Sequence, residues 1–292
     1  MARDGTAPLE RVGLVGCGLM GSGIAEACAR AGLDVVVVET SAGAMAAGER
    51  RIDASLQRAV RAGKLDEATA GAARGRIHTS TDLADLADRH VVIEAVTESE
   101  PEKLEVFTAL DKLVEAPDAI LASNTSSIPI MKLAMATQRP SQVVGIHFFN
   151  PVPVLPLVEL VTSLLTSDTT VERARSFATE VLGKHVIRSK DRAGFIVNAL
   201  LIPYLLSAVR MLESGFATEE DIDTGMVKGC AHPMGPLALA DLIGLDTTVA
   251  VAQSLYDEFK EPLYAPPPLL LRMVDAGLLG RKSGRGFYSY ER

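Results

Sequence analysis

The 292-residue chain predicts an α/β domain followed by an all-α domain. Three observations lead to this class. A glycine-rich loop directly follows the first apolar segment, short apolar segments then alternate with helical stretches, and strand signals nearly vanish after Asp191. Alternating strands and helices are typical of a parallel sheet covered by helices. We therefore expect one domain over residues 1–190 and a second, helical domain over residues 191–292.

The first domain is expected to contain short strands that are buried on both faces. The run DVVVVE at residues 34–39 has the nearly continuous apolar character of a central parallel strand. Strands are predicted at residues 11–15, 34–39, 90–96, 119–123, 142–149, 157–161 and 184–189. Helices are predicted at residues 22–31, 42–62, 66–74, 100–115 and 168–182.

In the second domain, the sequence predicts helices at residues 194–214, 218–229, 236–258 and 267–276. The stretch 196–212 is apolar on nearly every side, but Asn198, Pro203 and Arg210 interrupt it. It therefore fits a buried helix better than a membrane span. Because these helices carry more apolar surface than a lobe of this size normally hides, we expect a homodimer formed through this domain.

The bulk composition excludes several classes of function. The net charge of −8 and the absence of tryptophan argue against a nucleic-acid partner. The three cysteines have no paired spacing, so neither a disulfide framework nor a metal site is expected. The first ten residues lack an apolar run, which predicts no secretory signal and a cytoplasmic protein without membrane association.

The glycine-rich loop has the pattern GxGxxG at residues 16–21 and opens a helix directly after a strand. The first glycine permits a tight turn, the second lets a pyrophosphate approach the backbone, and the third permits close helix–strand packing. The free N–H groups of the helix start attract phosphate. This context predicts a Rossmann-type dinucleotide-binding domain. The expected cofactor contacts in the loop are Gly16, Gly18, Leu19, Met20 and Gly21.

Glu39 ends the second predicted strand, eighteen residues after Gly21. Its carboxylate can accept hydrogen bonds from the ribose hydroxyls of the adenosine and would repel a 2′-phosphate. No arginine follows immediately. The pattern therefore favours NAD over NADP as the cofactor.

His147 and Glu159 are the candidate catalytic pair. The histidine lies at the end of the apolar segment 142–149, and the glutamate lies twelve residues later on the next apolar segment. A carboxylate bonded to one ring nitrogen fixes the tautomer and stabilises the imidazolium, so the other nitrogen can act as a general base. The alternative interpretation is a buried structural histidine at the end of a strand.

Several motifs together resemble the L-3-hydroxyacyl-CoA dehydrogenase family. They are GCGLMGSGIA, ASNTSS (122–127), HFFNPVPVLPLVEL (147–160), GFIVNALLIPY (194–204), HPMGPLALADLIGLD (232–246) and GRKSGRGFYSY (280–290). The resemblance runs from about residue 10 to the C-terminus. It implies NAD-dependent interconversion of (S)-3-hydroxyacyl-CoA and 3-ketoacyl-CoA, with short acyl chains such as 3-hydroxybutyryl, in fatty-acid or butanoate metabolism.

The resemblance also assigns roles to single residues. It makes His147 the general acid and base and Glu159 the group that orients it. It gives Ser126 and Asn198 hydrogen bonds to substrate oxygens near the reacting carbon, which is where fixed donors stabilise developing charge. Apart from the resemblance, Ser126 fits an ordinary polar turn. Further cofactor contacts are implied for Glu98, Lys103, Asn150 and Lys282.

A basic cluster at residues 50–64 is the expected site for the CoA handle. It contains Arg50, Arg51, Arg58, Arg61 and Lys64 within an acidic chain, and the spacings of seven and three are expected to place Arg51, Arg58 and Arg61 on one side of the predicted helix. CoA is polyanionic, so a local cationic face suits it. The resemblance adds Ser55 as a contact, but Ala62 stands where some relatives carry lysine, so Arg61 and Lys64 are the expected substitutes. The alternative is a solvated helix face with salt bridges.

Three other functions stay open at this point. A hydroxyacyl carrier-protein dehydrogenase would use the same chemistry with a protein surface in place of CoA. The β-hydroxyacid dehydrogenases share a similar glycine loop but use a lysine, which the pairing of His147 with Glu159 argues against. A non-catalytic, crystallin-like NAD-binding protein would be expected to have lost His147, Glu159 or Asn198. No metal is expected, because hydride acceptance belongs to the nicotinamide.

Overall fold

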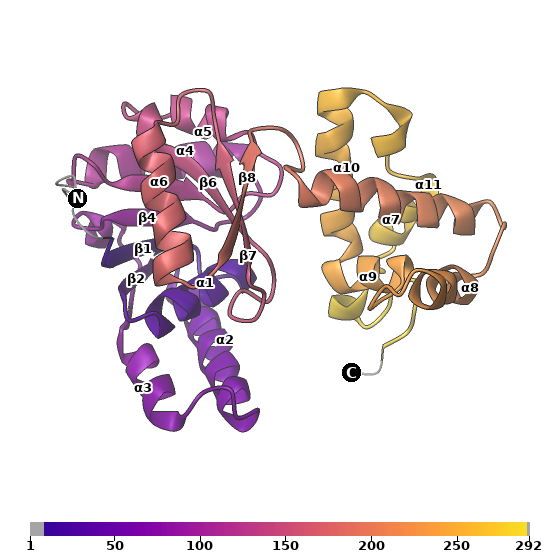
Figure 1. The fold of residues 1–292 in the computed structure, drawn as a ribbon, viewed down its shortest axis with the longest axis horizontal. Coiled ribbons are helices and arrows are strands. Elements are labelled where there is room, and N and C mark those ends of the chain that lie inside the picture. Colours follow the sequence, from indigo (N-terminus) through magenta and orange to yellow (C-terminus); the bar gives the residue numbers. More distant parts are fainter. Residues whose placement is uncertain (1–8, 291–292) are drawn as a thin grey trace. The chain divides into compact units, whose positions relative to one another are not determined.

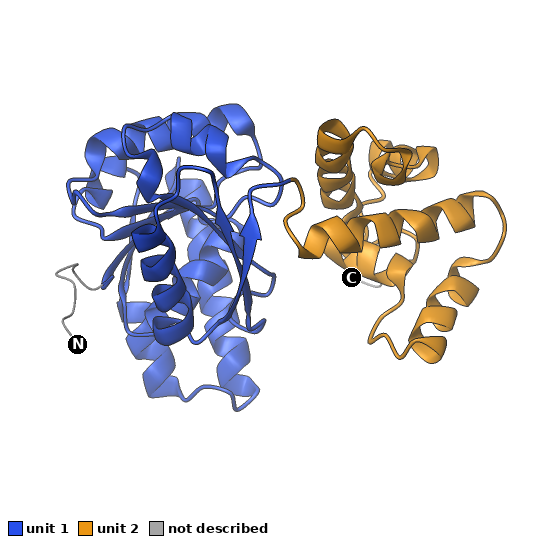
Figure 2. Cartoon of the chain, turned by 45° about the horizontal axis from the view of Figure 1, so that its top comes forward, with its two compact units in different colours: residues 1–192 blue, residues 193–292 orange. Residues whose placement is uncertain are grey.

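The structure, a computed structural model, describes residues 9–290 of the chain (Figure 1). The N-terminal segment for which no secretory signal is predicted therefore lies mostly outside the described residues. Two compact units divide after Arg192 (Figure 2). Each unit has its own hydrophobic core. The predicted class, a Rossmann-type α/β unit followed by an all-α unit, is confirmed.

The first unit is built on an eight-stranded sheet with the strand order β3-β2-β1-β4-β5-β6-β7-β8. All neighbouring strands are parallel except β6 and β7, which are antiparallel. The strands are β1 (Arg11–Val15), β2 (Asp34–Val38), β3 (Ile77–Ser80), β4 (Val91–Glu94), β5 (Ile120–Ser123), β6 (Val143–Phe148), β7 (Leu157–Thr162) and β8 (His185–Lys190).

Helices cover this sheet because successive strand residues point to opposite faces. One core cluster joins strand residues such as Leu14 and Val37 to Ile24, Ile52 and Val171 from three surrounding helices. Helices α4 and α5 pack against each other, and α5 also packs on β6. The helices of this unit are α1 (Leu19–Arg30), α2 (Ala42–Arg61), α3 (Glu67–Gly75), α4 (Glu100–Leu113), α5 (Ile130–Met135) and α6 (Asp168–Ser176).

One strand and one α-helix of the first unit were not predicted. Strand β3 has the sequence IHTS and lies at the edge of the sheet with only Ile77 buried, so it lacks an apolar run. Helix α5 is only six residues long and too short for a helical period to show. Helix α1 also begins at Leu19 instead of residue 22, because its first turn lies inside the glycine motif.

The second unit consists of helices around one apolar core. They are α7 (Val197–Glu213), α8 (Glu219–Thr224), α9 (Pro236–Ile243), α10 (Leu245–Phe259) and α11 (Pro268–Asp275). Among the described residues no single helix is long and apolar enough to cross a membrane, although the bent pair α9 and α10 passes by length and composition.

The prediction of one helix over residues 236–258 is wrong. Gly244 separates α9 from α10, and the two helices meet at 97°. The φ angle of Gly244 is +104°, in a region that a residue with a Cβ atom adopts only with strain. The apolar period continues across this glycine, which is why the sequence pattern hides the break.

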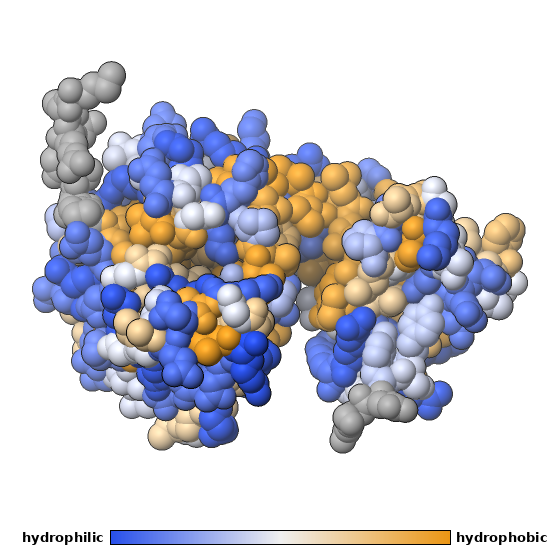
Figure 3. All heavy atoms as spheres, turned by 60° about the horizontal axis from the view of Figure 1, so that its bottom comes forward, coloured by the Kyte–Doolittle hydropathy of each residue, from blue (hydrophilic) through white to orange (hydrophobic). Residues whose placement is uncertain are grey.

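Helix α7 is amphipathic and not buried on all sides, contrary to the sequence-based prediction. Leu205, Leu206 and Val209 lie in the core of the unit. Leu200, by contrast, is 74% exposed, and Phe216 in the following loop is 80% exposed. Figure 3 shows apolar side chains on the surface of this unit as well as of the first.

Candidate active site

His147 and Glu159 face each other across two neighbouring strands. Strands β6 and β7 are antiparallel, and their register pairs these two residues directly. The two side chains are buried, and Nδ1 of His147 lies 2.7 Å from Oε2 of Glu159. An ionised carboxylate can only accept a hydrogen bond, so in the neutral imidazole Nδ1 carries the ring hydrogen and Nε2 presents its lone pair.

Ser126 completes a hydrogen-bonded series with this pair. It lies in the loop that follows β5, the parallel neighbour of β6, and its Oγ is 3.1 Å from Nε2 of His147. The order Ser126, His147, Glu159 resembles the geometry of a catalytic triad, in which the acid orients the imidazole. Here the far nitrogen can exchange a proton with a hydroxyl group placed beside Ser126.

Glu98 holds the loop that presents Ser126. Its Oε1 accepts hydrogen bonds from the hydroxyl of Thr125 at 2.5 Å, the backbone N–H of Ser126 at 2.9 Å, and both the N–H and the hydroxyl of Ser127 at 3.0 and 2.8 Å. Burial alone would raise the pKa of Glu98. The Lys103 ammonium and these hydrogen bonds outweigh that effect and hold the pKa below its usual range.

Lys103 is a buried cation behind this loop. It is 1% exposed, and its Nζ lies 2.5 Å from Oε1 of Glu94 and 3.2 Å from Oε2 of Glu98. Glu94 is also buried and accepts a hydrogen bond from Ser123 Oγ at 2.6 Å. Lys103 thus connects Glu94 at the end of β4 with Glu98, and Ser123 connects the end of β5 with the same Glu94. The expected contact of Lys103 with the cofactor stays a prediction.

The glycine loop has the backbone that a phosphate-binding turn needs. The φ angle of Gly16 is +96°, and a Cβ on Gly21 would lie 1.9 Å from the carbonyl oxygen of Gly16. A Cβ on Gly18 would instead meet open space. Among the described residues no side chain caps the start of α1, so its first N–H groups are available to an anion.

Glu39 is joined to this loop. Its Oε1 accepts the N–H of Cys17 at 2.7 Å, and its Oε2 accepts the N–H of Thr40 at 3.0 Å. A cavity of about 780 Å³ opens beside Gly16, Gly18 and Glu39. The open space at Gly18, the uncapped helix start and the carboxylate at the end of β2 together fit the pyrophosphate and adenosine ribose of a dinucleotide.

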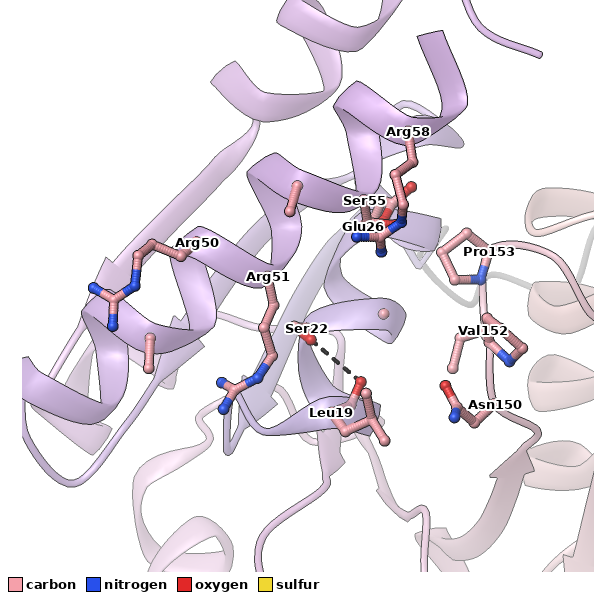
Figure 4. Close-up of a pocket in the computed structure, with 14 residues that line it drawn as sticks. Leu19, Ser22, Glu26, Arg50, Arg51, Ser55, Arg58, Asn150, Val152 and Pro153 are labelled. Atoms are coloured by element: carbon pink, nitrogen blue, oxygen red, sulfur yellow. Dashed lines mark hydrogen bonds between the residues drawn. The ribbon is translucent and has the colours of Figure 1, made fainter. Parts of the chain in front are cut away.

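A second pocket of about 390 Å³ lies between α1, α2 and the loop after β6 (Figure 4). It contains the predicted contact Ser55 and also Leu19 and Asn150, two of the predicted cofactor contacts. Its charged lining residues are Glu26, Arg50, Arg51 and Arg58. Arg51 also donates to the carbonyl oxygen of Cys17 at 3.3 Å, so this pocket borders the glycine loop.

The structure separates Arg61 and Lys64 from this pocket. Arg61 lines a different hollow with Glu67 and Arg74, between α2 and α3, and Lys64 follows the end of α2 on the exposed surface. The grouping of Arg61 with Arg51 and Arg58 on one side of the helix is therefore wrong.

Two predicted residues belong to the helical unit. Asn198 lies half-buried in the first turn of α7. Lys282 donates to Oδ2 of Asp246 at 2.6 Å, near the glycine that separates α9 from α10. Over residues 9–290, no group of three or more His, Cys, Asp or Glu side chains is arranged to hold a metal ion.

Comparison with known proteins assigns the class. Residues 11–192 match the family described as "3-hydroxyacyl-CoA dehydrogenase, NAD binding domain", and residues 194–290 match "3-hydroxyacyl-CoA dehydrogenase, C-terminal domain". The chain belongs to the 3-hydroxyacyl-CoA dehydrogenase family, an NAD-dependent group of oxidoreductases, as its motifs predict.

Individual relatives are similar over almost the whole chain. The 3-hydroxybutyryl-CoA dehydrogenase of Mycobacterium tuberculosis is 60% identical over 97% of this chain and 99% of its own length. The crystal structure of M. tuberculosis FadB2 superposes with a TM-score of 0.97 at 60% identity, covering 98% of this chain and 100% of that one. The crystal structure of (S)-3-hydroxybutyryl-CoA dehydrogenase from Ralstonia eutropha gives 0.91 at 48% identity, covering 97% and 100%.

Proposed function

We propose that the protein interconverts (S)-3-hydroxybutyryl-CoA and acetoacetyl-CoA with NAD as cofactor, as an enzyme of the cytoplasm. The observation that carries the proposal is the hydrogen-bonded series of Ser126, His147 and Glu159. A non-catalytic NAD-binding protein would have no need for a buried imidazole with an oriented tautomer. The names of the M. tuberculosis and R. eutropha relatives support the choice of a short acyl chain.

The proton steps follow from the ring geometry. In the direction of oxidation, Nε2 of His147 takes the proton of the substrate C3 hydroxyl as a general base. The imidazolium that forms is stabilised by Glu159, 2.7 Å from Nδ1. In the direction of reduction, the same Nε2–H returns the proton to the C3 oxygen. Ser126, 3.1 Å from Nε2, is close enough to donate a hydrogen bond to that oxygen.

The glycine loop, the uncapped start of α1 and Glu39 would hold the dinucleotide. When bound, NAD supplies the acceptor for the hydride from the substrate carbon, and NADH supplies the donor in the reverse direction. Glu39 binds the adenosine ribose in this assignment and disfavours the 2′-phosphate of NADP. Asn150, Lys103 and Lys282 remain proposed cofactor contacts, and Asn198 a proposed substrate contact. Glu98 is proposed to act by holding the loop that presents Ser126.

The pocket in Figure 4 is the proposed site for the CoA handle. Ser55 and the arginines at 50, 51 and 58 give it hydrogen-bonding and cationic groups that suit phosphates. This local charge favours CoA over a carrier protein, whose pantetheine arm carries only one phosphate.

A homodimer through the helical unit is also proposed. Leu200 and Phe216 expose large apolar side chains, and an apolar hollow of about 340 Å³ in the same unit is lined by Tyr204 and Met211 of α7 and by Met226 of the turn after α8. Exposed apolar groups of this kind mark interfaces.

The direct test is NADH oxidation followed at 340 nm with acetoacetyl-CoA, with NADPH and an acetoacetyl carrier protein assayed in parallel. Rapid turnover with NADH and acetoacetyl-CoA supports the proposal. Turnover that requires the carrier protein would replace the CoA assignment. Inactivity with every substrate and cofactor would contradict the catalytic assignment itself.

A further inference from the structure

Glu26 on α1 is a buried carboxylate with one oxygen unpaired. The residue is 1% exposed. Its Oε1 accepts a hydrogen bond from Nη1 of Arg30 at 3.3 Å, one helical turn later. Its Oε2 is buried and has no hydrogen-bond partner among the described residues. Because an unpaired buried acceptor destabilises the folded state, such an atom calls for a partner that the chain alone does not supply.

Glu26 lines the same pocket that is assigned to the CoA handle. In Figure 4 it lies with Ser55 and Arg58 toward one end of the pocket, whereas Leu19 and Asn150 lie toward the other. Arg58 shares the pocket but forms no ion pair with Glu26 within the described structure. The carboxylate therefore contributes an acceptor and a negative charge to a pocket that is otherwise cationic.

These charges restrict which part of a ligand each wall can take. Phosphate groups are attracted to the three arginines and repelled by a carboxylate. The unpaired oxygen of Glu26 instead requires a hydrogen-bond donor without negative charge. The CoA handle carries such donors in two places: the amide N–H and hydroxyl groups of its pantetheine arm, and the exocyclic amine of its adenine.

We propose that Oε2 of Glu26 accepts a hydrogen bond from an uncharged N–H or O–H donor of the acyl-CoA handle and so fixes its orientation in the pocket. This inference rests on the proposed function. With the phosphates bound by arginine and a neutral donor bound by Glu26, only one direction of the handle satisfies both walls. Glu26 thus determines specificity in binding and takes no part in the proton transfer.

Two substitutions at Glu26 separate this role from a structural one. Glu26→Met keeps the length of the side chain but removes the acceptor, so the Kd for CoA should rise about 5- to 20-fold. Glu26→Gln combined with Arg30→Met keeps one carbonyl oxygen, which no longer pairs with Arg30 and can accept from the ligand, so the Kd of this double variant for CoA should stay within about threefold of the wild type. Isothermal titration calorimetry with CoA measures both, and the Kd for NADH should be unchanged in both.

Arg30→Met is the matched control. It removes the ion-pair partner of Glu26 and leaves the unpaired oxygen in place, so CoA binding should persist. The ligand-free Glu26→Met protein should also melt no lower than the wild type, because the substitution removes a buried unpaired polar atom. A clear loss of melting temperature in Glu26→Met, repeated in Arg30→Met, would indicate a structural ion pair and overturn the proposal.

The source of the donor is found by repeating the assay with acetoacetyl-pantetheine, which lacks the nucleotide. If Glu26→Met also raises the KM for acetoacetyl-pantetheine, the donor lies in the pantetheine arm. If the KM for this substrate is unchanged, the donor lies on the adenine. The proposal fails if Glu26→Met binds CoA as the wild type does, or if Glu26→Gln combined with Arg30→Met is as weak as Glu26→Met. Wild-type protein that neither binds CoA nor reduces acetoacetyl-CoA would instead refute the proposed function.

Discussion

Glu98 should act on catalysis through Ser126, although the family resemblance implies a cofactor contact. Four hydrogen bonds from Thr125, Ser126 and Ser127 end on one oxygen of its carboxylate. In Glu98→Gln the carbonyl oxygen still accepts, but each charge-assisted bond becomes a neutral one, which weakens it by about 1 kcal/mol. The amide also loses the attraction of Lys103, 3.2 Å away in the native chain.

The size of the effect depends on how much of the lost hydrogen-bond energy had stabilised the transition state through Ser126. If about 1–2 kcal/mol of it is lost at the hydroxyl of Ser126, kcat should fall about 5- to 30-fold. The KM for NADH should change little. A residue that only contacts the cofactor would give the opposite split, with a higher KM for NADH and nearly native kcat.

A double-mutant cycle tests the coupling. In a Ser126→Ala background, Glu98→Gln should lower kcat by less than about twofold further, because the hydroxyl that it positions is gone. Glu100→Gln is the matched control, since Glu100 makes an exposed ion pair with Lys132 at 2.7 Å and should keep native kinetics. If the two active-site substitutions act independently, so that their fold-losses multiply in the double variant, Glu98 does not act through Ser126.

Three further predictions concern the cofactor, the break between helices and the assembly. Glu39→Ser combined with Thr40→Arg should shift the ratio of kcat/KM for NADPH over NADH by at least about tenfold, because a cation then replaces the carboxylate at the ribose; an unchanged ratio would mean that Glu39 does not read the ribose. Gly244→Ala should lower the free energy of unfolding by about 1–3 kcal/mol in urea titrations, because φ is +104° and a Cβ would lie 3.0 Å from Oδ1 of Asp246. Gly43→Ala is the control and should not lower the free energy of unfolding, because open space surrounds that glycine. Sedimentation at micromolar concentration should give a dimer that Leu200→Glu weakens; a wild-type monomer would contradict the assembly.

The fold was largely predictable because its signals are local. The continuous apolar strands, the glycine loop and the loss of strand signals after Asp191 are readable without tertiary information. The edge strand β3 and the break at Gly244 were missed for opposite reasons. Strand β3 consists mostly of polar residues, so no apolar run marks it, whereas the apolar period of the helix continues across Gly244 and hides the break. Tertiary neighbours decide both, since β3 pairs with β2 and Gly244 packs near Lys282.

The site was predictable where chemistry follows from spacing, and less so where it depends on helix phase. Successive helical residues turn by about 100°, so Arg51 and Arg58 differ by only about 20° in direction, while Arg61 turns about 60° further. That rotation directs Arg61 toward α3 and leaves Arg58 in the pocket. The anchoring of Ser126 by Glu98 joins residues 28 positions apart, and no local pattern reveals it.

His147 is proposed to move the proton of the substrate hydroxyl. His147→Gln keeps a polar side chain of similar reach but removes the titratable ring, so kcat with acetoacetyl-CoA should fall about 10²- to 10⁴-fold. The Kd for NADH, measured by fluorescence titration of the same protein, should remain close to that of the wild type. A variant that binds NADH normally and turns over at a near-native rate would show that His147 is not the general acid and base.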